Sequence, residues 1–507
     1  MLIFNAKDIV CLYKNIDKKT WIAFFIIIIA GLGVRLWVIP HMHHTYHDEF
    51  EHLSIAENLH FHHKYSETLQ GTYNHPEETL MKTWPPGYHM ILALSYNLFS
   101  VSENTAFNTT AVISALSILL MFLLAYALFT EKTTALYSAF LLALAPVHLK
   151  YSGSTSTEIC SFFFLLLSLW TAALYAKYAK FKHLLLLIFT TAFAIYTRPE
   201  NGILLLLIPL FVIFFTKRAD FPRKKIIFHT TLATIILLPL ISFYFLHNFY
   251  YAIFTIKETG WADSLPTRLF FLQKSLPGNL TFWFGPGHPA SVTFLAIFGF
   301  IKLFKHKRRA AIFLSIWFCI FLLVYSAHYT GRFNSISDRH ALNLYIPIIL
   351  MAAYGIFALS NRWANKLVIK RNIIFILLAS VFLSTFFPLS TTISKTLSDS
   401  KNSEYQFILT NKNKIPEDIY IISFNPNIII SSIHKKAITP FLFVNLENKP
   451  KKAILFQDYW YRKNEKERMP LENYLKKNYD FDILLDNNSK SDPCSLILLT
   501  AKKERPY

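Results

Sequence analysis

A helical protein that crosses a membrane many times is the fold class that the sequence predicts. Hydrophobic residues make up 53% of the 507-residue chain, and the mean hydropathy is +0.34, which is too apolar for an ordinary soluble domain. Several apolar runs exceed the roughly 18 residues that identify a transmembrane helix, among them 21–39, 108–129, 159–179 and 226–246. Short basic clusters separate these runs, a pattern typical of cytoplasmic loops.

The net charge of +20 does not favour nucleic-acid binding, because Lys and Arg lie in short clusters between apolar runs rather than along one stripe. Such clusters instead set the topology and attract anionic lipid headgroups. The four cysteines are scattered and lack the spacing of a disulfide framework or a thiolate metal site. The sequence therefore predicts membrane lipid as a partner and no nucleic acid.

The basic clusters predict how the chain threads through the membrane. The positive-inside rule places 7–19, 132, 177–182, 217–225, 302–309 and 362–371 in the cytoplasm. About eleven spans, within a range of eleven to thirteen, satisfy this rule: 21–39, 108–129, 133–149, 158–179, 183–197, 202–216, 226–247, 289–304, 310–327, 340–358 and 370–389. We therefore expect a multi-pass protein of the plasma (inner) membrane, with a cytoplasmic N-terminus over 1–20 and a transmembrane domain over 21–395.

Two further segments need separate interpretations. In the first outer loop, 40–107, residues 87–101 are apolar but too short to span, so we expect a helix at the outer membrane interface. Residues 400–507 interleave β-like runs at 418–424, 453–456, 481–486 and 495–500 with helical patterns. This alternation predicts a small C-terminal α/β domain on the extracytoplasmic side.

Asp48 and Glu49 follow the first span by about nine residues and open an expected amphipathic helix over 48–60. Carboxylates near the N-terminus of a helix are favoured by its dipole, which explains one of the pair. Charges close to the bilayer are also typical of functional sites, and a carboxylate there can act as a general base. Asp48 is the stronger candidate, because it lies nearer the helix start and the membrane.

Arg198 lies in a break between two apolar runs, within Thr197-Arg198-Pro199-Glu200-Asn201. One interpretation is a tight turn with a side chain that extends to the interface. The other is a phosphate contact, since a guanidinium suits fork-like binding of phosphate oxygens. Arg332 and Arg339 have the same two interpretations.

Ten of the nineteen histidines lie in the first outer loop. Polar residues at an interface explain them, although the spacing of His43 and His47 is also compatible with a zinc site. Asp48, Glu49 and Glu158, with His47, would be the ligands of a hard divalent ion. The sequence requires no cofactor and leaves a divalent metal as an open alternative.

Five elements, in order over residues 20–350, resemble the C-type glycosyltransferases, in particular the branch of protein O-mannosyltransferases and lipid A aminoarabinose transferases (glycosyltransferase family 39-like). The elements are Tyr46-x-Asp48-Glu49, Lys82-x-Trp84-Pro85-Pro86-Gly87-Tyr88-His89, the loop 146–158 that ends at Glu158, Thr197-Arg198-Pro199-Glu200, and Asp338-Arg339-His340 continuing to Pro347. Members of this family transfer a sugar from a polyprenyl phosphate outside the cytoplasm. The resemblance therefore implies a polyprenyl-phosphate-linked sugar as donor and a protein, lipid or glycan as acceptor.

The resemblance also implies roles for individual residues. Asp48 would be the catalytic base, and Glu49 would support it or orient the donor. The cations that would bind the donor phosphate are Lys82, Arg198, Arg332 and Arg339, and the supporting residues would be Tyr46, Trp84, His89, Glu158 and Glu200. The chain departs from the family in the histidine cluster and in the missing Asp of the loop 146–158.

Two other function classes fit the sequence less well. A transporter or flippase of lipid-linked glycans needs ionisable residues deep in the membrane, whereas the expected spans contain chiefly Arg35, near one end. A non-catalytic scaffold with an outer C-terminal domain would leave Asp48, Glu49 and Arg198 without a role. We therefore expect a glycosyltransferase.

Overall fold

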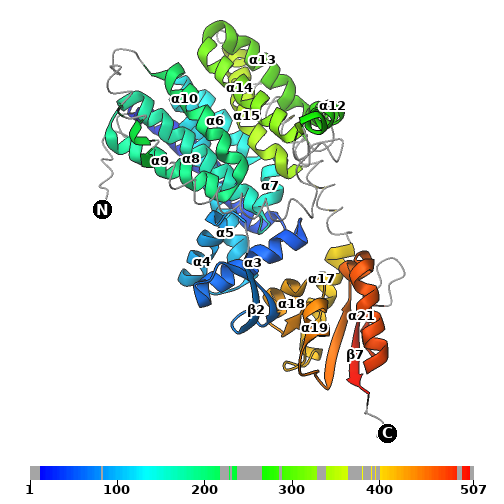
Figure 1. Ribbon diagram of the computed structural model, residues 1–507. Helices are drawn as coiled ribbons and strands as arrows, with labels where there is room; N and C mark the ends of the chain where they lie inside the picture. The colour runs from blue at the N-terminus through cyan, green and yellow to red at the C-terminus, as the bar shows by residue number, and fades with distance from the viewer. Residues whose placement is uncertain are drawn as a thin grey trace. The chain divides into compact units, whose positions relative to one another are not determined.

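The structure is a computed structural model that describes residues 12–81, 84–216, 265–284, 288–327, 338–362, 400–487 and 494–502, together with single positions at 228–236, 380, 390 and 394 (Figure 1). The chain divides into two compact units. The first, here called the helical unit, comprises Met1–Pro40, Thr110–Gly153 and Thr157–Thr392. The second, the sheet unit, comprises His41–Thr109, Ser154–Ser156 and Ile393–Tyr507.

The helical unit is built mainly from apolar helices, and the helix that begins at Glu103 enters it at Thr110. They are α2 (Lys18–Gly33) with the π-helix η1 (Val34–Val38), α5 (Glu103–Phe129), α6 (Lys132–Ala143), α7 (Pro146–Ser152), α8 (Thr157–Tyr178), α9 (Phe181–Thr197), η2 (Pro199–Ile203), α10 (Leu204–Phe215), α12 (Leu265–Thr281), η4 (Phe282–Phe284), α13 (Ala290–His306), α14 (Arg308–Ala327) and α15 (Asp338–Arg362). Five stretches are long and apolar enough to cross a membrane: Lys18–Val38, α5, α8, α14 and Asp338–Asn361.

Nine of the eleven predicted spans coincide with helices of the described part of the chain. The predicted spans 226–247 and 370–389 lie almost entirely outside the described residues. The helices α9 and α10 are apolar but shorter than a full span. A membrane protein of mainly helical structure is confirmed, whereas the number of spans stays a prediction.

Contacts between helix ends fit the predicted alternation. At one end, Asp17 pairs with Lys132, and the Arg309 guanidinium donates to the Phe214 carbonyl over 3.3 Å. At another, Lys150 Nζ lies 3.0 Å from Asp338 Oδ2. Asp17, Lys132 and Arg309 lie in ranges that the positive-inside rule placed in the cytoplasm, and Phe214 lies at the end of the predicted span that leads into 217–225. Lys150 and Asp338 lie in predicted outer loops.

Two glycines allow the backbones of α13 and α15 to touch. A Cβ atom at Gly299 would lie only 1.8 Å from the Met351 carbonyl oxygen, and one at Gly355 only 2.3 Å from that of Leu295. Small residues at helix crossings give membrane helices the close packing that replaces a hydrophobic driving force. Figure 1 shows α13 and α15 among the neighbouring helices of this unit.

The sheet unit contains a seven-stranded sheet in the order β2-β1-β4-β3-β5-β7-β6. Its elements are α3 (Tyr46–His62), β1 (Ser66–Gly71), β2 (Pro76–Met81), α4 (Gly87–Leu98), α17 (Ser400–Asn411), η5 (Lys412–Lys414), β3 (Ile421–Ile422), α18 (Pro426–Ile433), β4 (Ala437–Ile438), α19 (Pro440–Asn445), β5 (Lys452–Gln457), α20 (Tyr459–Lys463), α21 (Glu465–Asn478), β6 (Tyr479–Asp486) and β7 (Ser495–Ala501). The strand β3 pairs in parallel with β4 and β5, and the other pairs are antiparallel.

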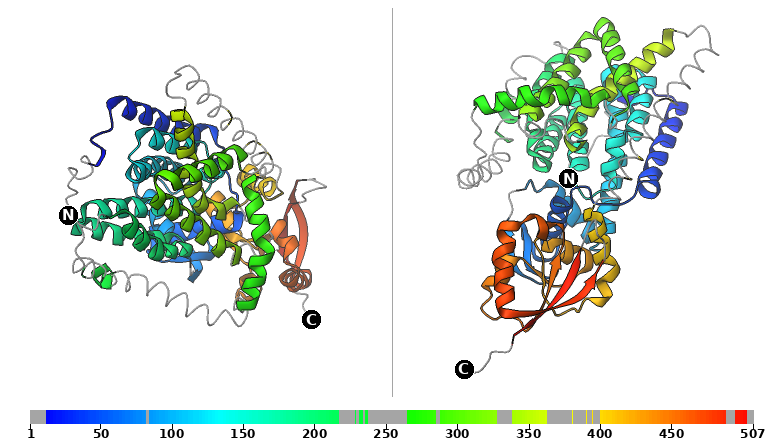
Figure 2. Two further views of the ribbon diagram at one scale, coloured as in Figure 1. Left: turned by 90° about the horizontal axis from the view of Figure 1, so that it is seen from above. Right: turned by 90° about the vertical axis from the view of Figure 1, so that its right-hand side faces the viewer.

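Alternating side chains of the strands bury both faces of this sheet. Ile421 and Ile454 pack with residues of α17 and α18, whereas Ile422 and Leu455 pack with residues of α19 and α21. The right-hand view of Figure 2 shows the C-terminal strands with α21, in red, alongside them. The result is a helix–sheet–helix sandwich.

The sheet unit is larger than the C-terminal domain expected over 400–507. The strand β1, from the first loop, pairs with β4 at Gln70↔Ile438 and Gly71↔Ala437, and β2 continues the sheet beside β1. Sequence patterns did not indicate β1 and β2, because their polar residues lack the apolar alternation of a half-buried strand. The first loop and the C-terminal segment therefore form one unit.

The helix α4 corresponds to the expected interfacial helix. Its 12 residues span roughly 18 Å, less than the roughly 30 Å of a bilayer core. Met90, Leu94 and Leu98 are 53%, 58% and 68% exposed along one side, whereas Tyr88 and Leu92 are buried. This amphipathic pattern suits a helix at a membrane surface, and that location stays a prediction.

Candidate active site

Asp48 and Glu49 both lie in the first turn of α3. Because neighbouring helix positions point about 100° apart, the two carboxylates have different surroundings. Glu49 is fully buried, and Asp48 is partly exposed. The structure thus separates two carboxylates that the sequence presented as a pair.

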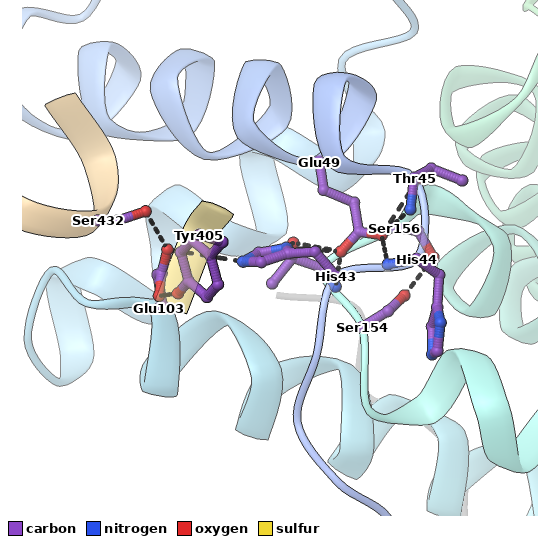
Figure 3. A network of polar contacts seen from close by, with 10 residues as sticks. His43, His44, Thr45, Glu49, Glu103, Ser154, Ser156, Tyr405 and Ser432 are labelled. Carbon is purple, nitrogen blue, oxygen red and sulfur yellow. Dashed lines mark hydrogen bonds and ion pairs between the residues drawn. The ribbon is translucent and has the colours of Figure 1, made fainter. Parts of the chain in front are cut away.

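Glu49 fixes the start of α3 (Figure 3). Its Oε1 accepts hydrogen bonds from the backbone N–H groups of His44 and Thr45, at 2.7 and 2.8 Å. Its Oε2 accepts from the Thr155 N–H and from Thr155 Oγ1, both at 3.0 Å. Thr45, the N-cap residue, makes no side-chain cap of its own, so Glu49 satisfies donors at the helix start. The hydrogen bonds of Glu49 therefore stabilise the start of this helix.

A buried histidine continues this network toward the C-terminal segment. His43 Nδ1 lies 2.9 Å from Glu49 Oε2, and His43 Nε2 lies 3.6 Å from Glu103 Oε1. Glu103 in turn accepts hydrogen bonds from Tyr405 and, at 2.6 Å, from Ser432. Figure 3 shows these side chains in one line of polar contacts.

Electrostatics favour charged forms of both His43 and Glu49. Burial lowers the pKa of His43, but the nearby carboxylates of Glu103 and Glu49 outweigh burial and raise that pKa to about 9. Burial raises the pKa of Glu49, but its hydrogen bond to His43 outweighs this and lowers that pKa to about 2. At neutral pH the network therefore holds an imidazolium between carboxylates.

The Trp84–His89 element attaches to the second turn of α3. Trp84 Nε1 donates to Glu51 Oε2 over 2.9 Å, and His89 Nε2 lies 2.9 Å from His52 Nδ1. Tyr65 Oη donates to the Trp84 carbonyl over 2.6 Å. Burial, followed by the nearby His52, holds the pKa of His89 well below its usual value. Trp84 and His89 therefore support α3 as neutral hydrogen-bonding groups.

A second cluster lies in the helical unit, where ends of helices meet. Arg198 Nη1 lies 2.5 Å and Arg339 Nε lies 2.7 Å from the same atom, Glu158 Oε1. Arg198 Nε also lies 2.5 Å from Glu200 Oε1. The structure thus brings together four residues from three of the five sequence elements.

The two arginines of this cluster differ in access. The Arg339 side chain is 23% exposed and the Arg198 side chain 10%, whereas Glu158 is almost fully buried. A guanidinium paired with a carboxylate keeps its charge and can share it with an anion such as phosphate. Arg339 is the better placed of the two for an incoming anion. Lys82 and Arg332 lie outside the described residues.

The described residues contain no group of three or more His, Cys, Asp and Glu side chains that could hold a metal ion. Both oxygens of Glu49 accept N–H or O–H groups, and His47 Nε2 pairs with Glu51 Oε1 at 3.0 Å. A metal bound by Glu49 would have to displace these donors. The contacts of Glu49 therefore do not fit the ligand set that the sequence left open.

Sequence reasoning missed four members of the buried network, Thr155, Glu103, Tyr405 and Ser432, and considered His43 only as an interfacial polar residue or a zinc ligand. Tyr405 and Ser432 lie about 300 positions from Glu103 along the chain. No local pattern connects residues so far apart. Only Glu103, an acidic residue at the start of a long apolar run, carried a signal, as a helix-start residue.

Residues 83–244 match the family model described as dolichyl-phosphate-mannose-protein mannosyltransferase. An uncharacterised protein of Aquifex aeolicus (strain VF5) is 26% identical over 326 residues, a match that covers 61% of this chain. The matched part spans 60% of that relative's length.

Solved structures show the same fold. ArnT from Cupriavidus metallidurans in the apo state matches with a TM-score of 0.63 and 11% identity, over 94% of this chain and 97% of ArnT. ArnT bound to undecaprenyl phosphate matches with a TM-score of 0.58 and 13% identity, over 97% and 100%. The oligosaccharyltransferase AglB from Archaeoglobus fulgidus, in complex with an inhibitory peptide and a dolichol-phosphate, matches with a TM-score of 0.56 and 11% identity, over 97% and 75%. The expected C-type glycosyltransferase fold is therefore confirmed, and this chain is a membrane protein with the fold of ArnT and AglB.

Proposed function

We propose that this chain is a glycosyltransferase that moves a sugar from a polyprenyl-phosphate donor to an acceptor on the extracytoplasmic face of the plasma (inner) membrane. The match to the mannosyltransferase family model and the fold shared with ArnT and AglB support the donor class. The observation that carries the assignment is the first turn of α3. Glu49 is fully buried, whereas Asp48 is partly exposed and lies nearer the helix start, so Asp48 is the carboxylate assigned to chemistry.

The proposed reaction is a single displacement. Asp48 takes the proton of the acceptor hydroxyl or amine as that group attacks the anomeric carbon of the sugar. The bond between the anomeric carbon and the phosphate oxygen breaks, and polyprenyl phosphate leaves with the electron pair. The sugar is transferred with inversion, and no covalent enzyme intermediate forms.

The cations have the complementary role. Negative charge grows on the leaving phosphate in the transition state, and prearranged positive groups stabilise it. Arg339 and Arg198 are the described candidates, held in place by Glu158. Lys82 and Arg332 are assigned the same role on the basis of the resemblance. Glu200, which pairs with Arg198, would position that guanidinium.

The substitution Asp48→Asn tests the function directly. Glycolipids and glycoproteins of cells with and without the chain are compared by mass spectrometry, which identifies the product that depends on it. Asp48→Asn is expected to insert normally and to lower formation of that product by about 10²–10⁴-fold. The control is Asp418→Asn, an exposed carboxylate of the sheet unit. Unchanged product formation by Asp48→Asn would exclude the proposed base.

Chelation tests the metal alternative separately. Membranes that contain the wild-type chain are treated exhaustively with EDTA before transfer is measured. Because a metal bound by Glu49 would have to displace the donors that this carboxylate accepts, we expect transfer to persist. Loss of transfer that Mg²⁺ or Mn²⁺ restores would show that a metal takes part.

A further inference from the structure

We propose that His43 is a positioning residue whose imidazolium, held between Glu49 and Glu103, ties the first turn of α3 to the helices α17 and α18 of the C-terminal segment. This inference rests on the proposed function, because its importance for transfer depends on Asp48 being the base. It gives a task to residues that the proposed reaction does not use. It also assigns a role to the C-terminal segment.

The His43 ring is buried among aromatic side chains. Its ring centroid lies 4.3 Å from that of Phe50, 5.1 Å from Phe107, 5.4 Å from Tyr405 and 5.9 Å from Tyr46. His43 itself is 1% exposed. Aromatic rings around a cation favour its charged form, most strongly where water is excluded.

The charged and titratable side chains that face His43 come from three helices. They are Glu49 and Tyr46 of α3, Glu103 of α5 and Tyr405 of α17. From the segment 154–156, Thr155 Oγ1 adds a neutral contact, 3.3 Å from His43 Nδ1. Two carboxylates thus oppose one imidazole, and tyrosine hydroxyls carry no charge near neutral pH.

Only the protonated ring can donate to Glu49 and also direct an N–H at Glu103, 3.6 Å away, because a neutral imidazole has a single N–H. Deprotonation would leave either the Glu49 contact or the Glu103 contact without its donor. Since the pKa of His43 is raised to about 9, the double link is complete at neutral pH and is lost as the pH rises through that value.

The link has a direct route to Asp48. Glu49 organises the backbone at His44 and Thr45, immediately before the helix turn that carries Asp48. On the other side, Glu103 accepts from Tyr405 of α17 and Ser432 of α18. The protonated His43 joins these two sets of contacts. Its loss would loosen the first turn of α3 without removing any group that touches the substrate.

The test combines a pH profile with Glu103→Gln. For the wild-type chain in isolated membranes, formation of the chain-dependent product should fall at alkaline pH with a midpoint near the His43 pKa of about 9. Glu103→Gln removes one of the two carboxylates, so the midpoint should move down by about one pH unit or more. A role in folding alone would lower activity without moving the midpoint.

The neighbouring serines of α18 provide a matched pair of controls. Ser432 donates to Glu103, whereas Ser431 donates to Glu57 over 2.9 Å. Ser431→Ala should leave the alkaline midpoint unchanged. Ser432→Ala removes a neutral donor to Glu103 but no charge, so its midpoint should not fall as it does in Glu103→Gln. His43→Gln, which cannot carry a charge, should show low transfer without an alkaline limb near the wild-type midpoint.

A second measurement is independent of transfer. Hydrogen–deuterium exchange of the full chain in detergent reports on a peptide that covers 43–50, with the rates corrected for intrinsic pH dependence. This peptide should exchange faster in Glu103→Gln than in wild type, and Ser431→Ala should match wild type. Unchanged exchange and an unmoved midpoint in Glu103→Gln would overturn the inference. If Asp48→Asn still forms product, Asp48 is not the base. The hydrogen–deuterium exchange of the peptide 43–50 then decides by itself whether His43 links α3 to the C-terminal segment.

Discussion

Replacing Glu49 by Gln distinguishes a structural carboxylate from a chemical one. The two oxygens of Glu49 accept from His44, Thr45 and Thr155, and Oε2 also contacts His43. Glutamine has one acceptor oxygen and one NH₂ group. In either orientation the NH₂ group would face donors, so at least one pair of contacts is lost.

The expected size of the effect follows from these contacts. Each buried donor left without an acceptor costs about 1–3 kcal/mol, and breaking a buried ion pair from one side costs about 3–5 kcal/mol. These costs overlap, because the same donors surround one carboxylate. We therefore expect Glu49→Gln to lower the free energy of unfolding of the sheet unit by about 3–5 kcal/mol.

Thermal unfolding of the full chain in detergent measures this change. At about 2–4 °C per kcal/mol for a unit of this size, the apparent unfolding temperature should fall by about 6–20 °C. Asp48→Asn, at a partly exposed position, is the matched control and should change stability by less than about 1 kcal/mol. If Glu49→Gln unfolded at the same temperature as wild type, the division of roles between the two carboxylates would be refuted. A larger loss of stability in Asp48→Asn than in Glu49→Gln would refute it as well.

The pH dependence of this difference has a definite sign. The pKa of Glu49 is lowered from 4.5 to about 2 in the folded chain. Its contribution to the free energy of unfolding is therefore complete above pH 4.5, the unfolded pKa, and is lost as the pH falls toward the folded pKa. The difference in unfolding temperature between wild type and Glu49→Gln should therefore become smaller in acid.

Three further substitutions test other parts of the structure. Gly299→Val should prevent the close contact of α13 with α15, because a Cβ at Gly299 would lie 1.8 Å from a carbonyl oxygen. The folded variant should therefore fail to accumulate in membranes. The control Gly202→Ala should accumulate normally, because a Cβ at Gly202 would have nothing within 4 Å. Glu158→Gln leaves two guanidinium groups without their shared carboxylate and should destabilise the helical unit by about 3–5 kcal/mol, seen as a lower temperature of aggregation in detergent. Burial raises the pKa of Glu57 from 4.5 to about 8, so the folded chain loses stability as the pH rises through this window. Glu57→Gln should therefore unfold at a higher temperature than wild type above about pH 8. In acid the two unfolding temperatures should be nearly equal.

Local sequence signals predicted the membrane helices well. Apolar length and the positions of basic clusters are local properties, and they identified nine segments that the structure describes as helices. The same signals failed for β1 and β2, whose polar residues become strands only because β4 pairs with β1. The domain boundary at 400 was drawn from composition, whereas the compact unit joins first-loop and C-terminal residues.

The candidate site shows the same division between local and distant information. The sequence located Asp48, Glu49, Glu158, Arg198 and Arg339, because ionisable residues beside apolar runs are conspicuous. It ranked Asp48 above Glu49 as the base, but it could not show that Glu49 is buried and Asp48 partly exposed, since both are acidic residues in one helix turn. Burial and hydrogen-bond partners decide that difference, and both depend on residues far away in the chain.

The sequence by itself determined that this is a helical membrane protein and which loops carry its charged residues, because hydrophobic length and charge placement act residue by residue. Tertiary structure alone decided that Glu49 is buried and hydrogen-bonded at the start of α3, that Glu158 pairs with two arginines, and that His43 lies between Glu49 and Glu103. The physical reason is that the charge state and partners of a buried group are set by what surrounds it in space. For His43 that environment is assembled from four separate stretches of the chain, so no single stretch reveals it.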